Sequence, residues 1–130
     1  MKVVFDTNIL VSALVFSGGR GEAALERIVA ARDQLVISQP IIDELLGILS
    51  RKFSRDAGEL AHVAVFLSEV GALVKPRQRL QVVADEPENR ILECAVAGHA
   101  DAIVTGDKAL PDVSEHEGVK IISLRAYLAG

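Results

Sequence analysis

Sulfur-containing and aromatic residues are scarce in this sequence of 130 residues, which has one Cys, one Met, one Tyr, four Phe and no Trp. A single cysteine, Cys94, excludes a disulfide framework and fits a reducing compartment. With so few aromatic side chains, stacking on unpaired bases is not expected to dominate any recognition of nucleic acid.

Long hydrophobic runs and an excess of basic residues are also absent. The early apolar run 9–16 is far shorter than the roughly 20 residues that cross a bilayer, so we expect no membrane span. Asp6 interrupts the stretch where a secretory signal would be continuously apolar, which favours a cytoplasmic protein. The net charge of −4 argues against a generally basic coat for nucleic acid. It leaves metal-dependent nucleases open, because their sites are themselves built of carboxylates.

The sequence does contain a regular alternation of short β-rich runs and longer helical patterns. Half of its residues are hydrophobic and they are spread along the chain, which predicts one domain over 1–130. Short apolar runs at 2–5, 35–37, 102–104 and 119–122 are typical of strands buried on both faces, and 73–74 and 81–83 are weaker candidates. This alternation predicts an α/β domain with a parallel sheet.

Apolar residues with helical spacing predict helices near 25–32, 41–49, 60–70 and 91–95, and Ser123 is a suitable N-cap for a short final helix. The segment 19–24 fits a Gly-x-Gly-x-x-Ala pattern, but it follows a helical stretch and is interpreted as a turn between helices. The basic segment 75–81 has no periodicity and is expected to be a loop. The basic side chains of this segment and of 51–55 have two interpretations: they are simply solvated, or they form a basic rim that contacts RNA.

Four acidic residues are expected near the carboxyl ends of the predicted strands. Asp6 directly follows the first strand, and Asp107 follows the strand 102–104. Glu44 lies one turn into the helix after the second strand. Glu88 lies in the first turn of a later helix, three residues after Asp85, which is the spacing of a helix cap. Each residue alone is compatible with an ordinary cap, turn or solvated side chain.

The joint arrangement of these acids is more informative than any one of them. Ligands of open α/β sheets bind outside the carboxyl ends of the strands. Clustered carboxylates repel one another and raise one another's pKa unless a cation joins them. Oxygen ligands favour hard ions, so the pattern predicts a Mg²⁺ or Mn²⁺ site and hydrolysis of a phosphodiester.

Four blocks of the sequence resemble the PIN-domain ribonucleases. Val3-Val4-Phe5-Asp6-Thr7-Asn8 resembles the opening of that family, and 100–107 resembles its final block, a strand ending in a Thr-x-Asp signature. Glu44 resembles the family's second acid, and 88–95 resembles its third block. The order of the blocks is similar to that of stand-alone bacterial and archaeal PIN proteins regarded as toxins of toxin–antitoxin pairs.

The resemblance implies a three-layer α/β/α sandwich around a mainly parallel sheet, and cleavage of RNA that depends on Mg²⁺ or Mn²⁺. It also implies a homodimer and a cognate antitoxin protein. The family's third acid is usually Asp, whereas this chain has Glu88, whose carboxylate reaches one methylene further; Asp85, one turn earlier, is a possible compensation. The implied metal ligands are Asp6, Glu44, Glu88 and Asp107, with Asn8 and Thr105 as polar support.

Two alternatives stay open at this point. A haloacid-dehalogenase-type phosphatase also places an Asp after its first strand, but that family wants a second Asp where this chain has Asn8. A catalytically degenerate PIN domain would bind RNA or a protein without cleaving it, and Glu88 keeps this alternative open.

Overall fold

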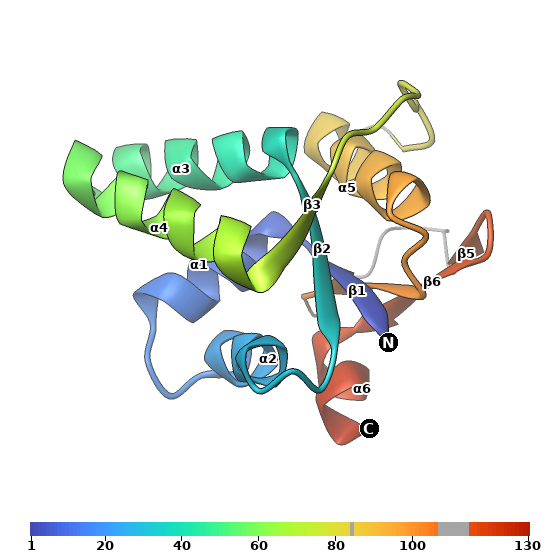
Figure 1. Ribbon diagram of the computed structural model, residues 1–130, viewed down its shortest axis with the longest axis horizontal. Coiled ribbons are helices and arrows are strands. Elements are labelled where there is room, and N and C mark those ends of the chain that lie inside the picture. The colour runs from blue at the N-terminus through green and yellow to red at the C-terminus, as the bar shows by residue number, and fades with distance from the viewer. Residues whose placement is uncertain (84, 107–114) are drawn as a thin grey trace.

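A six-stranded sheet forms the centre of the protein (Figure 1). The structure is a computed structural model that describes residues 1–83, 85–106 and 115–130. The strands are β1 (Lys2–Phe5), β2 (Gln34–Ser38), β3 (Gly71–Val74), β4 (Ala102–Thr105), β5 (Glu115–His116) and β6 (Val119–Ser123). Their order in the sheet is β3-β2-β1-β4-β6-β5.

All neighbouring strands pair in parallel except β5, which is antiparallel to β6. In the central pairs Val3 lies opposite Leu35 on β2, and Val4 opposite Ile103 on β4. The carboxyl ends of the parallel strands therefore share one edge of the sheet, and β1 is central with β2 and β4 on either side.

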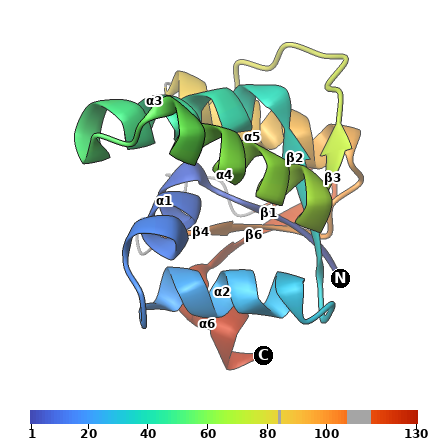
Figure 2. The ribbon, with the colours of Figure 1, turned by 60° about the vertical axis from the view of Figure 1, so that its left-hand side comes forward.

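Helices cover both faces of the sheet (Figure 2). The layers consist of α3, α4 and α5 on one side and of α2 and α6 on the other, while α1 contacts both α2 and α3. This arrangement confirms the three-layer α/β/α architecture. The helices are α1 (Thr7–Val15), α2 (Arg20–Val29), α3 (Gln39–Phe53), α4 (Ala57–Val70), α5 (Glu86–Ala97) and α6 (Leu124–Ala129).

The apolar residues of the strands account for the centre of the core. Val3, Val4 and Phe5 on β1 are almost fully buried, as the continuous apolar pattern predicts for a strand covered on both faces. Cys94 belongs to the same core, where burial raises the pKa of its thiol to about 12. It is therefore a packing residue and not a nucleophile.

Most of the predicted elements are confirmed, and three differ. The segment 81–83 is not a strand, because the amides of Val82 and Val83 donate to a buried side chain of α5 instead of to a sheet. The helix predicted to reach residue 32 ends at Val29, and β5 was not predicted. The apolar stripe of α4 forms a helix as expected, but Leu67 is its one buried residue.

The glycine-rich segment 19–24 was interpreted as a turn between helices, but only Gly19 lies outside α2, whose first turns contain residues 20–24. Gly19 caps α2, and a Cβ on Gly21 would lie 2.8 Å from the backbone nitrogen of Ala13. Glycine at this position thus permits the close approach of α2 to α1, and the pattern has a packing role. None of the helices in the described part of the chain is long and apolar enough to cross a membrane.

Candidate functional site

Asp6 occupies the carboxyl end of the central strand β1 and is held by backbone groups on both sides. It is the N-cap of α1: its Oδ1 accepts a hydrogen bond of 2.9 Å from the amide of Ile9. Its Oδ2 accepts one of 3.0 Å from the amide of Gly106, which follows β4. Two backbone donors from different elements therefore fix the carboxylate at the edge of the sheet.

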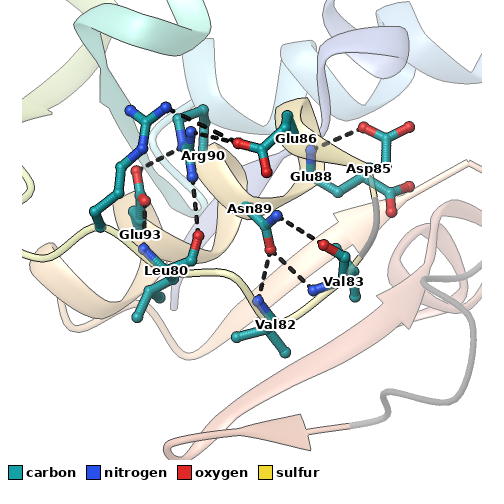
Figure 3. A network of polar contacts seen from close by, with 10 residues as sticks. Leu80, Val82, Val83, Asp85, Glu86, Glu88, Asn89, Arg90 and Glu93 are labelled. Carbon is teal, nitrogen blue, oxygen red and sulfur yellow. Dashed lines mark hydrogen bonds and ion pairs between the residues drawn. The ribbon is translucent and has the colours of Figure 1, made fainter.

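Glu44, Asp85 and Glu88 bring further carboxylates toward this edge from α3 and α5. Asp85 is the N-cap of α5, and its Oδ1 accepts from the amide of Glu88 at 3.2 Å, so the predicted cap is present. The side chains of Asp85 and Glu88 lie on the same side of the first turn of α5 (Figure 3). Asp85 is exposed, whereas Glu44 and Glu88 are half-buried.

The electrostatics show that these acids act on one another. Burial raises the pKa of Glu88, and the charges of Asp85 and Asp6 raise it further. Burial and the charge of Asp85 also raise the pKa of Glu44, while the cationic Arg51 opposes them. Asp6 at the end of β1, Glu44 on α3 and the acids at the start of α5 are thus within electrostatic range of one another, and the metal site expected from them stays a prediction.

Burial also raises the pKa of Asp6, against the backbone amides of Ile9, Gly106 and Asn8, which stabilise its ionised form. The ionised carboxylate therefore carries an uncompensated desolvation cost in the free protein. A cation at this edge would offset both that cost and the repulsion among the acids.

The donor set fits a hard divalent cation, since it consists of carboxylate oxygens. Within the described ranges, no three His, Cys, Asp or Glu side chains lie close enough together to hold a metal ion. Mg²⁺ is commonly held by one or two carboxylates with several waters, so a loose group of acids is compatible with it. Asp6, whose carboxylate two backbone amides fix, and Glu88, whose pKa the charge of Asp6 raises, are residues that could hold such an ion.

The supporting residues differ in what they contribute. Thr105 is buried at the end of β4, and its hydroxyl donates to the carbonyl of Gly106, next to the amide that binds Asp6. Asn8 is exposed, and its backbone amide, not its side chain, acts on Asp6. Asp107 lies outside the described residues, so its predicted role stays a prediction.

A buried polar network on α5, just beyond Glu88, was not predicted from the sequence (Figure 3). Asn89 is fully buried. Its Oδ1 accepts from the amides of Val82 and Val83 at 2.9 and 3.0 Å, and its Nδ2 donates to the carbonyl of Val83 at 2.8 Å.

Arg90, the residue after Asn89, and Glu93, one helical turn after Asn89, continue the network. Glu93 Oε2 accepts from the amide of Leu80 at 2.7 Å, and Arg90 Nη2 donates to the carbonyl of Leu80 at 2.9 Å. Arg90 Nε also lies 2.8 Å from Glu93 Oε1, as an ion pair. Asn89, Arg90 and Glu93, the α5 clamp, thus hold the segment before α5. The signal available in the sequence was Asn89 and Glu93, four residues apart and flanking the apolar pair Ile91 and Leu92.

A three-layer α/β/α domain with an acidic group at the carboxyl edge of its sheet defines a class that includes metal-dependent nucleases. The family model for the PIN domain matches residues 2–109. This chain therefore belongs to the PIN-domain family, whose members are generally nucleases.

Individual relatives are more distant. The chain is 29% identical over 114 residues to the uncharacterized protein MJ1680 of Methanocaldococcus jannaschii, covering 85% of this chain and 73% of that protein. It is also similar to the solved structure of VapBC2 from Rickettsia felis bound to a DNA fragment from their promoter. The TM-score is 0.65 at 19% identity, over 95% of this chain and 98% of that one. At this level of identity, the similarity to VapBC2 shows a shared fold.

Proposed function

We propose that this protein is an endoribonuclease that hydrolyses RNA phosphodiester bonds with Mg²⁺ or Mn²⁺ at the acidic edge of its sheet. The observation that carries the proposal is the placement of Asp6. Backbone donors of α1 and of the segment after β4 fix its carboxylate, and its charge raises the pKa of Glu88 on α5. Membership of the PIN-domain family supports the same reaction.

Each acid has a distinct part in this proposal. Asp6 is the fixed carboxylate that defines the position of the ion. Glu88 and Glu44 are further ligands, Asp85 keeps the surrounding potential negative enough to attract a cation, and Asp107 is the expected fourth ligand. When bound, Mg²⁺ or Mn²⁺ would supply activation of water and offset the charge that builds on the phosphate.

The biological setting is part of the proposal. The similar fold of VapBC2, a pair whose solved structure includes promoter DNA, supports a toxin that acts in the cytoplasm and is held by a cognate antitoxin protein. A homodimer is the expected assembly of such a toxin. The helix α4 offers apolar residues that are not buried in this chain, among them Val65, which is 55% exposed.

The proposed activity can be tested with a mixed pool of structured and unpaired RNA. The purified protein is incubated with Mn²⁺, with Mg²⁺ and with EDTA, beside Asp6→Asn and Asp107→Asn. Cleavage that needs a metal and is lost in both variants supports the proposal. Absence of cleavage with either metal, in protein whose circular dichroism shows it folded, contradicts it.

A second candidate is a PIN domain that binds RNA or a protein without cleaving it. The observation that favours it is Glu88, which replaces the usual Asp and is one methylene longer. Restored cleavage in Glu88→Asp would show that this residue had disabled the site. The phosphatase alternative is disfavoured by the family match, and the absence of a phosphoaspartate at Asp6 after incubation with a phosphate monoester would exclude it.

A further inference from the structure

The segment 75–83, here named the strap, joins β3 to the residues before α5 (Figure 1). It begins at the carboxyl end of β3, the edge of the sheet at which Asp6 lies two strands away. The strap has no regular secondary structure, yet the α5 clamp holds its second half through five backbone amide or carbonyl groups of Leu80, Val82 and Val83.

Three basic side chains project from the first half of the strap. Lys75, Arg77 and Arg79 occupy alternate positions, and all three are exposed. Across the described ranges, no hydrogen bond or ion pair engages the side chains of Lys75 and Arg77. Arg79 makes a loose ion pair of 3.9 Å with Glu86, and 72% of its side chain is exposed. In a chain of net charge −4, this row is a local concentration of exposed positive charge.

The strap lines two hollows in the surface. One, of about 860 Å³, lies between the strap and the later turns of α5. The other, of about 400 Å³, lies between Lys75, Arg77 and Arg79 on one side and Gln39 and Pro40 on the other. Gln39 and Pro40 form the start of α3, just before the turn that carries Glu44. The basic row therefore opens onto the helix that bears part of the acidic site.

The α5 clamp also fixes the strap relative to the acids. Asn89, which binds Val82 and Val83, is the next residue after Glu88, and Asp85 lies two residues after Val83. One rigid helix therefore carries both the acids and the groups that hold the strap. Two buried polar side chains, Asn89 and Glu93, and the half-buried Arg90 are devoted to this irregular surface segment, which indicates that its position matters.

We propose that the strap is a binding surface for the phosphate backbone of the RNA strand that is cleaved at the acidic edge. The inference rests on the proposed function. A strand that approaches a cluster of carboxylates is repelled, and Lys75, Arg77 and Arg79 supply attraction beside it. The basic row contains no aromatic residue, so its contacts are to phosphates and do not depend on base sequence.

The test compares two triple variants with the same change in charge. The strap variant is Lys75→Gln, Arg77→Gln and Arg79→Gln. The control variant is Lys2→Gln, Arg32→Gln and Lys120→Gln, whose residues are exposed near the amino ends of β1, β2 and β6. Binding of a short fluorescein-labelled single-stranded RNA is measured in EDTA by anisotropy over a series of salt concentrations, with two unrelated base sequences.

Each phosphate contact to a single strand contributes about 0.7 to the slope of log K against log salt, so loss of three contacts should reduce the slope by about 2. We take the two proteins to bind equally near 1 M salt, where ionic contacts contribute nothing. A slope difference of about 2 over one decade of salt then means that the strap variant binds roughly 100-fold more weakly than the wild type near 0.1 M salt. The control variant should bind as the wild type does, and both RNA sequences should lose affinity equally.

Three outcomes would overturn the inference. If the wild-type protein cleaves RNA and the strap variant shows the wild-type slope of log K against log salt, the strap does not bind RNA, and the proposed function is unaffected. Equal losses in the strap and control variants would show that only net charge matters. A wild-type protein that neither binds nor cleaves RNA would refute the inference together with the proposed function.

Discussion

Truncation of Asn89 should release the strap at a cost that can be worked out from its contacts. Asn89 is fully buried and makes three hydrogen bonds of 2.8 to 3.0 Å to Val82 and Val83. A hydrogen bond within a protein contributes about 1 kcal/mol net, so Asn89→Ala should lower the free energy of unfolding by about 3 kcal/mol. The backbone groups of Val82 and Val83 can be rehydrated if the strap detaches, so a much larger loss is not expected.

Two measurements test this reasoning. Urea denaturation gives the free energy of unfolding, and amide hydrogen exchange reports the protection of Val82 and Val83 directly. Gln78→Ala is the matched control, because Gln78 is an exposed residue of the same strap and its loss should change stability by no more than about 0.5 kcal/mol. A loss below about 1 kcal/mol in Asn89→Ala, with the two amides still protected, would refute the role of the clamp.

Three further variants test the packing and electrostatics of the fold. Gly21→Ala should lower stability by about 1–3 kcal/mol in thermal denaturation, because its Cβ would lie 2.8 Å from the backbone nitrogen of Ala13. Tyr127→Phe removes a hydrogen bond of 2.6 Å to Asp33 and should cost about 1 kcal/mol at neutral pH. Burial raises the pKa of Asp33, but the Tyr127 hydroxyl and other donors outweigh it and leave the pKa lowered. The free energy of unfolding of the wild type and that of Tyr127→Phe should therefore become more alike as the pH falls through the lowered pKa of Asp33. Glu88→Gln should raise the melting temperature in EDTA, because burial and the neighbouring carboxylates destabilise the ionised side chain.

The placement of Asp6 followed from the sequence because β1 and its neighbour β4 are short and mainly apolar strands. Once 2–5 and 102–104 are recognised as neighbouring buried strands, Asp6 and the segment 105–106 must meet at one edge of a parallel sheet, as the hydrogen bond from Gly106 to Asp6 confirms. The cap formed by Asp85 was likewise readable from its spacing to Glu88.

The α5 clamp could not be derived in the same way. The residues 81–83 have the composition of a strand, and local propensity alone favours that assignment. What decides their conformation is Asn89, a tertiary partner that takes the amides of Val82 and Val83. Periodicity predicted the helix α4 but not how deeply it is buried: Leu60, Val63 and Val70 of its apolar stripe pack against the core but are only partly buried.

The central claim is tested most directly by the rate of RNA cleavage as a function of Mn²⁺ concentration. The wild type is compared with Asp6→Asn and with Asp43→Asn, whose exposed carboxylate accepts a hydrogen bond from Gln39 and serves as the control. The wild type and Asp43→Asn should show rates that rise with Mn²⁺ and saturate, while Asp6→Asn should stay at the level measured in EDTA. Cleavage by Asp6→Asn at the wild-type rate, or undiminished cleavage in EDTA, would contradict the assignment of the acidic edge as the metal-dependent site.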